Sequence, residues 1–217
     1  MKSDTQLQLN VLDELKWQPS VDASQVGVTA QDGVITLTGS VPHYAEKLEA
    51  ERIAKSVLGV KAVVNDLEVH LGGTSDRNDT EITNAALYTL RWHTWIPNDR
   101  IKVTVRNGWV TLEGDVDWQY ERAAAREAVS HLIGVKGVTN LISLTTKPQP
   151  TDIARKIESA FKRSAEIDAR HVKIEAHDNT VVLTGRVSSP SELAEAEGVA
   201  WSAPGVTKVD NRLTISR

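Results

Sequence analysis

Cysteine is absent from the 217 residues, and the chain holds one methionine and one phenylalanine. The lack of cysteine excludes disulfides, thiolate metal sites and cysteine nucleophiles. No stretch approaches the roughly 18 consecutive apolar residues that a membrane-spanning helix needs. The first seven residues, Met1 to Leu7, contain no continuous apolar run and no small-residue cleavage site. They therefore predict a cytoplasmic protein, with a periplasmic location as the alternative if a leader has been removed.

Internal repetition is the main positive feature of the sequence. Three stretches share the pattern of a tight turn, a short strand and a glycine that is expected to end the strand, and these glycines are Gly39, Gly114 and Gly185. A Gly-Val pair follows each of them at a spacing of 20 residues. A fixed period of about 70 residues predicts tandem copies of one small unit. The predicted domains are residues 1–72, 73–147 and 148–217.

Charge divides unevenly among these repeats. Residues 1–72 carry 6 basic and 10 acidic side chains, residues 73–147 carry 9 of each, and residues 148–217 carry 10 of each. No repeat has the basic excess that a general nucleic-acid binder requires. Nucleic acid is therefore not an expected partner.

Each repeat is predicted to run helix, strand, strand, helix, strand. In the first repeat, Asp4 or Thr5 is expected to cap a helix that ends before Pro19. Asp32-Gly33 predicts a hairpin turn, and Gly59 is expected to cap the second helix at its C-terminus. In the third repeat Asn179 replaces the turn glycine, which is tolerable because asparagine enters the left-handed region. The predicted core positions of the first helices are Leu7, Val11, Leu12 and Leu15; Ile82, Ala86 and Leu90; and Ile153, Ile157 and Phe161.

The third predicted strand carries a further signature. An asparagine stands six residues after the Gly-Val glycine in every copy, at Asn65, Asn140 and Asn211. The αββαβ order, the motif D/N-G-x-[VI]-x-L-x-G and the motif G-V-x-x-V-x-N-x-[LI] together resemble the BON domain, named after bacterial osmotically inducible protein Y and nodulation. The resemblance covers nearly the whole chain as three consecutive copies.

This resemblance implies an α+β fold in which each repeat has a three-stranded mixed sheet with two helices on one face. It also implies a non-catalytic protein associated with osmotic or envelope stress, phospholipid surfaces or regions attached to secretin-like pores. The residues themselves contain no Gly-x-Ser-x-Gly elbow, no phosphate-binding loop and no set of three or four zinc ligands at defined spacing. We therefore expect no enzymatic activity, no catalytic residues, no metal and no cofactor.

Tryptophan is the most informative residue type, because the chain has six of them. Trp17 and Trp92 occupy equivalent places at the end of the first helix in two repeats, which favours a packing role. Trp95, Trp109 and Trp118 are specific to the second repeat. Strand alternation places Trp109 on the open face of the sheet.

The candidate binding surface is accordingly the second-repeat set Trp95, Lys102, Arg106, Trp109 and Trp118. Tryptophan beside cations suits the headgroup zone of an anionic phospholipid surface, and it suits a protein partner equally well. A third interpretation is that neighbouring repeats pack on this face. The predicted function is a non-enzymatic, stress-related binding protein that attaches to phospholipid surfaces or envelope-associated proteins. The alternative is a soluble chaperone-like or protein-interaction module without lipid affinity.

Overall fold

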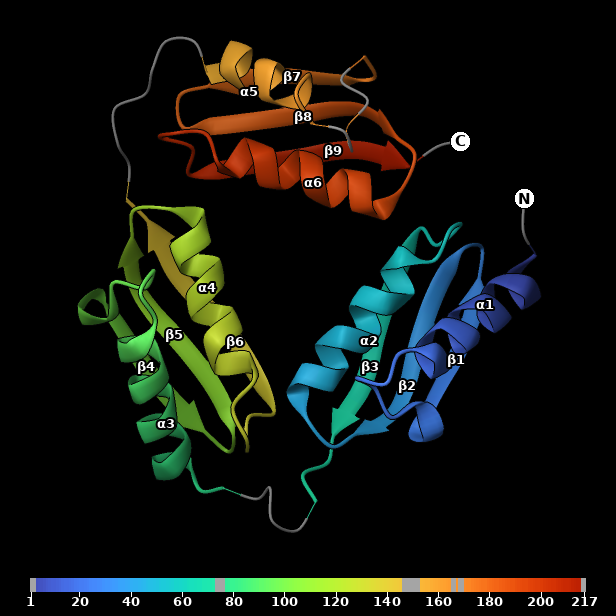
Figure 1. The fold of residues 1–217 in the computed structure, drawn as a ribbon, viewed down its shortest axis with the longest axis vertical. Coiled ribbons are helices and arrows are strands. Elements are labelled where there is room, and N and C mark those ends of the chain that lie inside the picture. Colours follow the sequence, from blue (N-terminus) through green and yellow to red (C-terminus); the bar gives the residue numbers. More distant parts are fainter. Residues whose placement is uncertain (1–2, 73–76, 146–152, 165–166, 168–169, 216–217) are drawn as a thin grey trace. The chain divides into compact units, whose positions relative to one another are not determined.

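The computed structural model describes residues 3–72, 77–145, 153–164, 167 and 170–215. Within these ranges the same unit occurs three times, each time with its own three-stranded sheet (Figure 1). Residues 73–76 at the start of the predicted second domain, and residues 148–152 at the start of the predicted third domain, lie outside the described residues.

The elements follow the predicted order in all three repeats. The first comprises α1 (Asp4–Trp17), the 3₁₀ turn η1 (Ala23–Gln25), β1 (Val26–Gln31), β2 (Val34–Val41), α2 (Tyr44–Ser56) and β3 (Ala62–Val69). The second comprises α3 (Asp79–Trp92), η3 (Asn98–Arg100), β4 (Ile101–Arg106), β5 (Trp109–Val116), α4 (Gln119–Ser130) and β6 (Gly137–Leu144). The third comprises α5 (Ile153–Phe161), β7 (Val172–His177), β8 (Thr180–Val187), α6 (Pro190–Trp201) and β9 (Lys208–Ile215).

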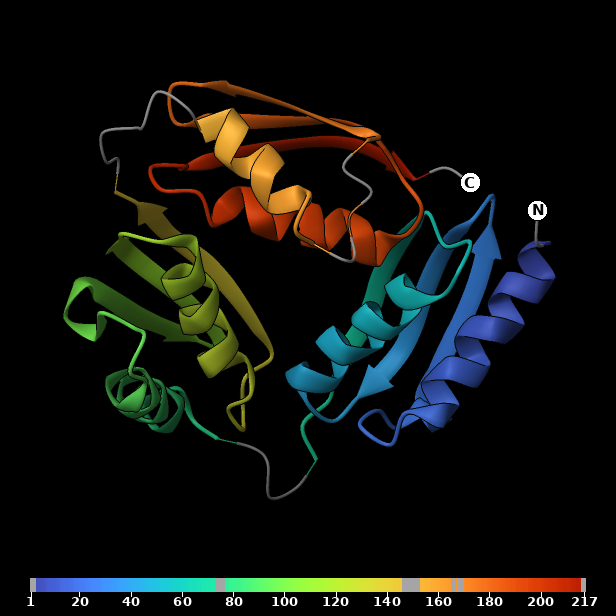
Figure 2. The same ribbon diagram turned by 45° about the horizontal axis from the view of Figure 1, so that its top comes forward.

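Each sheet is mixed, and its middle strand is the second one. In the first repeat β1 pairs with β2 antiparallel, and β2 pairs with β3 parallel across the connection made by α2. The third repeat has the same pairing. Both helices of a repeat cover one face of the sheet and leave the other face open (Figure 2). The predicted α+β fold is therefore confirmed.

The core lies between the helices and the covered face of each sheet. The predicted helix positions are buried in every repeat, from Leu7, Val11 and Leu15 in the first to Ile153, Ile157 and Phe161 in the third. Residues four apart fall on one side of a helix, so three such positions form a single apolar stripe. Leu12 is only partly buried against this core, whereas Ala50 on α2 is fully buried.

The helix caps differ from the prediction. The hydroxyl of Ser3, rather than Asp4 or Thr5, accepts the hydrogen bond that caps α1. Asn78 forms a reciprocal capping box with Glu81 at the start of α3. The first helical residue of each of these helices is left to make a different contact.

That contact joins the helix to the β-hairpin turn. The Asp4 carboxylate accepts hydrogen bonds from the backbone amides of Asp32 and Gly33, at 2.8 and 3.1 Å. In the second repeat the Asp79 carboxylate accepts from Asn107 and Gly108 at 2.8 and 2.9 Å. One aspartate thus satisfies both amides of a turn about 28 residues away in the chain.

Replacing Asp79 with alanine should lower the free energy of unfolding of the second repeat by about 1–2 kcal/mol, because two turn amides lose their acceptor. The measurement is hydrogen exchange of peptides from the second repeat, followed by mass spectrometry. Asp99→Ala, at an exposed aspartate of the same repeat, is the matched control and should change exchange little. Equal effects of the two substitutions would contradict this role of Asp79.

Two glycine predictions were wrong. Gly39, Gly114 and Gly185 lie within β2, β5 and β8 and do not end them, since these strands continue to Val41, Val116 and Val187. Gly59 does not cap α2, whose C-cap is Val57; it lies in the following turn with φ of 106°. The turn before β3 needs the left-handed region there, which glycine enters without steric cost.

The third hairpin turn also differs from expectation. Its left-handed residue is Asp178, with φ of 49°, while Asn179 is not among the residues of positive φ. The Asn179 side-chain amide instead donates to the backbone carbonyl of Gly205. Asparagine therefore contributes a side-chain hydrogen bond at this position and not a left-handed backbone.

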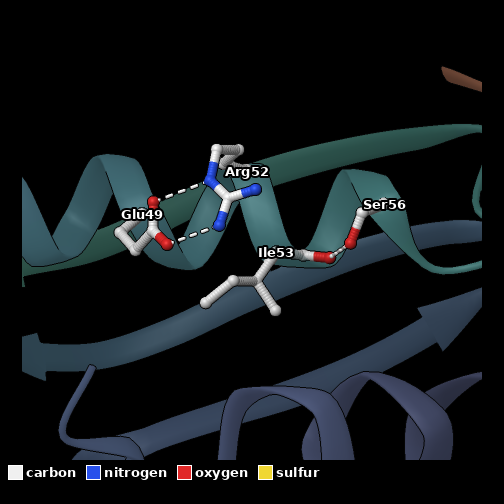
Figure 3. Close-up of polar contacts among 4 residues, drawn as sticks. All are labelled: Glu49, Arg52, Ile53 and Ser56. Carbon is white, nitrogen blue, oxygen red and sulfur yellow. Dashed lines mark hydrogen bonds and ion pairs between the residues drawn. The ribbon is translucent and has the colours of Figure 1, made fainter. Parts of the chain in front are cut away.

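The outer surface of α2 carries ordinary helical ion pairs. Arg52 donates to the Glu49 carboxylate through Nε at 2.8 Å and Nη2 at 2.6 Å (Figure 3). This hydrogen bonding holds the pKa of Glu49 below its usual 4.5. Ser56 Oγ donates to the carbonyl of Ile53 at 2.8 Å in the last turn (Figure 3). Solvent screens the exposed guanidinium, so we assign this pair at most about 0.5 kcal/mol.

Candidate binding surfaces

Exposed apolar side chains concentrate in the second repeat. Of the twelve large hydrophobic side chains that are exposed in the described part of the chain, eight belong to it: Leu87, Tyr88, Trp92, Trp95, Trp109, Tyr120, Ile133 and Leu141. The first repeat has Leu9, Trp17, Leu58 and Val64, and the described part of the third repeat has none. Large exposed apolar groups that gather on one domain indicate a contact surface.

Three of the five predicted surface residues share the open face of the second sheet. Trp109 on β5 pairs directly with Arg106 on β4. Lys102 pairs with Glu113 four residues further along the two strands. The alternate residues Val110 and Leu112 are fully buried, so Trp109 stands on the opposite side of the strand. We define Lys102, Arg106 and Trp109 as the open-face surface.

Trp109 is held in place by the neighbouring strand β6. Its Nε1 donates to Thr139 Oγ1 at 2.7 Å. A Cβ added at Gly137 would lie 2.5 Å from the indole, so the ring lies directly on that glycine. The corresponding pairs in the other repeats are Val34 with Ala62 and Thr180 with Lys208. Glycine thus occurs at this place only where a tryptophan covers it, a signal that repeat-to-repeat comparison of the sequence could have found.

The remaining two predicted residues lie at the other end of the strands. Trp95 precedes β4, which begins at Ile101, and Trp118 follows β5, which ends at Val116. Ile101 pairs with Gly114, whereas Arg106 pairs with Trp109, and these pairs stand five residues apart along the strand. That spacing is roughly 17 Å at the rise of a β-strand. Trp118 is partly buried and stacks on Tyr120 with ring centres 6.5 Å apart.

Trp95 instead belongs with residues at the end of α3. Tyr88 and Trp92 are four residues apart on the helix, and their ring centres lie 5.9 Å from each other. Trp95 meets the imidazole of His93 edge-on at 6.2 Å. Tyr88, Trp92 and Trp95 are 65, 72 and 65% exposed. We define these three residues as the helix-end surface; Tyr88 was not predicted to belong to any surface.

The expected packing role of Trp17 and Trp92 is wrong. They are 81 and 72% exposed, although the apolar residues Leu15 and Leu90 two positions earlier are buried. A step of two residues rotates a helix by about 200°, so these tryptophans face away from the core. Lys16 and Arg91 precede them, and the third repeat has Lys162 and the exposed Arg163 at the same place. A cation therefore recurs at the end of the first helix in all three repeats.

No group of three or more His, Asp or Glu side chains is arranged to hold a metal ion within the ranges that the structure covers. No helix in those ranges is both long enough and apolar enough to cross a bilayer. The surfaces described above consist of aromatic rings, aliphatic side chains and single cations.

The fold defines a protein built from three tandem αββαβ domains. The BON domain model matches residues 3–70, 78–146 and 150–217, so the chain belongs to the BON domain family, which is not known for enzymes. Among curated proteins it is similar to the osmotically-inducible protein Y of Escherichia coli strain K12. The two are 33% identical over 147 residues, which is 63% of this chain and 72% of the relative.

Solved structures add little to this assignment. The C-terminal domain of CdsD, a structural protein of the type III secretion system of Chlamydia trachomatis, is 14% identical with a TM-score of 0.26, and the alignment covers 100% of both chains. The PrgH periplasmic domain is 11% identical with a TM-score of 0.23, covering 95% of this chain and 100% of that one. Similarity at this level carries no argument about function.

Proposed function

We propose that this protein is a non-enzymatic, stress-related binding protein that attaches to anionic phospholipid surfaces. The observation that carries the proposal is the helix-end surface, where three of the most exposed aromatic side chains of the chain lie within one helix turn and the loop after it. Tryptophan and tyrosine favour the headgroup zone of a bilayer because one edge of the ring is apolar and the other is polar. Arg91, adjacent in sequence, supplies a cation for the lipid phosphate.

A second contact of the same kind supports the proposal. Trp17 in the first repeat occupies the place of Trp92, with Lys16 before it. Each contact alone is weak, since it contains few apolar groups. Two contacts on one chain raise the effective concentration of the second after the first has bound. The attachment is therefore expected to depend on both repeats.

The name of the similar Escherichia coli protein records induction by osmotic stress. We extend the stress-related role to this chain on the basis of that relationship. Osmotic change alters the tension and packing of membranes, which is a setting where a surface-attached protein would act.

The proposal is tested by co-sedimentation of the full chain with vesicles of phosphatidylglycerol and phosphatidylcholine, compared with phosphatidylcholine alone, at low and moderate salt. We expect binding to the anionic vesicles that weakens with salt, with a blue shift of tryptophan emission. Changing both Trp92 and Trp95 to serine should lower the partition coefficient at least about tenfold, because each ring loses its place among the headgroups.

The matched control is Trp109→Thr, which changes an equally aromatic residue on the open-face surface and should leave vesicle binding unchanged. Loss of binding in the control alone would place the lipid contact on the open face and contradict the helix-end assignment. Binding that ignores both salt and lipid charge would favour the alternative, a protein-interaction or chaperone-like role. That role would be recognised by suppression of aggregation of a denatured protein without lipid.

A further inference from the structure

The open faces of the three sheets differ in charge although their backbones are equivalent. In the first repeat this face carries Asp66 and Glu68 on β3 and no basic side chain. In the second it carries Lys102 and Arg106, with Glu113 opposite Lys102, and Asp115, which pairs with Arg100. In the third it carries both signs, on β7 and β9.

The cations on the open faces of the second and third repeats differ in whether they form ion pairs. Lys173, at the place of Lys102, pairs with Glu175 at 2.6 Å, and Arg212 pairs with Asp210 at 2.6 Å. The third open face therefore neutralises itself. Across the described ranges, neither Lys102 nor Arg106 has an ion-pair partner. The second open face thus presents two unpaired cations, Arg106 beside the half-exposed ring of Trp109 and Lys102 four residues away along β4.

The first open face has the opposite character. Asp66 has no ion-pair partner among the described residues, and Glu68 pairs with His70 at 3.0 Å only when the imidazole is protonated. Beside these carboxylates lie Val34, Ala62 and the 43% exposed Val64. The charges of this face are acidic and its side chains are small, whereas the second face carries the Trp109 ring and two unpaired cations.

We infer that the open face of the first repeat binds the open face of the second repeat in another copy of this chain. Sheets that pack face to face lie about 10 Å apart with their strands nearly aligned. When the two sheets are related by an axis parallel to the strands, the first strand of one lies over the third strand of the other. Asp66 on β3 then meets Lys102 on β4, and Trp109 meets Val34 at the hairpin-turn end of the two middle strands.

The same arrangement matches large residues with small ones. Leu141 on β6 comes to lie over Gly27 on β1, and Arg106 comes to lie over Ala62. Glycine and alanine leave room for these side chains. A single alignment of the two sheets therefore brings together both the opposite charges and the large and small side chains.

The size of the faces indicates how many contacts a stable dimer needs. Three strands of six to eight residues cover roughly 300 Å² on one side. One pair of faces therefore buries about 600 Å², which is below the range of stable interfaces. A two-fold dimer forms the contact twice, because each copy supplies one acidic and one basic face, and reaches about 1,200 Å². The dimer is therefore reciprocal.

The first experiment is sedimentation equilibrium of the full chain from about 1 to 200 µM. We expect a reversible dimer with a Kd on the order of 10 µM, given an interface at the lower end of the stable range. Asp66→Lys and Lys102→Asp each place like charges opposite each other at both contacts. Each substitution alone should raise the Kd at least about 30-fold.

Mixing the two variants gives the decisive result. In a heterodimer of the Asp66→Lys and Lys102→Asp chains, both contacts again join opposite charges, so dimerisation should return to within about threefold of the original Kd. A contact between repeats of the same chain predicts the reverse, namely no rescue on mixing. Rescue is therefore specific to the proposed partner, and its absence overturns the proposal.

The matched control is Lys173→Asp, at the equivalent place in the third repeat, which should leave the Kd unchanged. Trp109→Thr, which introduces the residue found at that place in the third repeat, should also abolish the dimer while circular dichroism shows a folded chain. A monomer at every concentration, or a dimer insensitive to Asp66 and Lys102, would overturn the inference. Vesicle binding through the helix-end surface is measured at chain concentrations far below the expected dimer Kd, where the Trp109→Thr control and the unmodified chain are both monomeric, so the two proposals fail independently.

Discussion

Replacing Gly114 with alanine should unfold the second repeat and leave the other repeats folded. Gly114 has φ of 133°, and a Cβ at this residue would lie 2.0 Å from the backbone oxygen of Arg100. A methyl group at that distance forces the main chain apart, and the positive φ adds strain of about 1–3 kcal/mol. We expect a total cost of about 4 kcal/mol, which is comparable with the whole stability of a domain of about 70 residues.

Two-dimensional ¹H–¹⁵N spectra measure this result directly, since the dispersed amide signals of the second repeat should collapse while those of the others remain. Gly39 and Gly185 stand in the same conformation, with φ of 108 and 125° and the same 2.0 Å approach to a backbone oxygen. Alanine at either should therefore unfold its own repeat in the same way.

Gly198→Ala is the matched control. This glycine lies inside α6, and an added Cβ would meet nothing within 4 Å. Alanine there should stabilise the third repeat by about 0.5–1 kcal/mol, because glycine loses more backbone entropy on helix formation. If Gly114→Ala leaves the spectrum dispersed, the close approach to Arg100 has no energetic consequence and our account of this position is wrong.

Replacing Asn140 with alanine should cost the second repeat about 2–3 kcal/mol. Its side-chain amide donates to the carbonyl of Arg122 on α4 at 2.9 Å, and its Oδ1 accepts from the amide of Ile142 at 3.1 Å. Removing the side chain leaves two partly buried backbone groups without partners, and each such loss costs about 1–3 kcal/mol. Hydrogen exchange of β6 and α4 peptides provides the measurement.

Asn140→Asp separates the two hydrogen bonds. The aspartate still accepts from Ile142 but cannot donate to Arg122, so it should recover only part of the loss. Asn98→Ala, at an exposed asparagine of the same repeat, should change stability by less than about 0.5 kcal/mol. A cost for Asn140→Ala no larger than that of the control would show that the repeated asparagine does not join the strand to the helix.

The equivalent asparagines of the other repeats also join the third strand to the second helix. Asn65 donates to the carbonyl of Lys47 at 2.9 Å, and Asn211 donates to the Glu197 carboxylate at 3.0 Å. Their period was visible in the sequence, but their role was not. The partners lie 14 to 18 residues away on a helix, a distance at which no local pattern indicates a hydrogen bond.

The candidate surfaces also include some placements that the sequence predicts and others that it does not. Alternation along β4 and β5 correctly placed Lys102, Arg106 and Trp109 on one face, because side chains of a strand alternate strictly. The grouping of Trp95 and Trp118 with them relied on nearness in sequence. The strands carry these two residues to the far end of the sheet, and Trp95 lies beside the end of α3 with Tyr88 and Trp92.

By itself the sequence determined the αββαβ order, the three repeats, the helix core positions and membership in the BON domain family. These features depend on periods of two, four and about 70 residues, which local backbone geometry converts directly into structure. Only the tertiary structure decided that Gly114 lies against Arg100, that Asp79 holds a distant turn and that Trp17 and Trp92 face away from the core. The first two contacts join residues that are far apart in the chain. The exposure of the two tryptophans depends on which side of the helix the last residue faces. Their cause is packing between elements, which no pattern along the chain records.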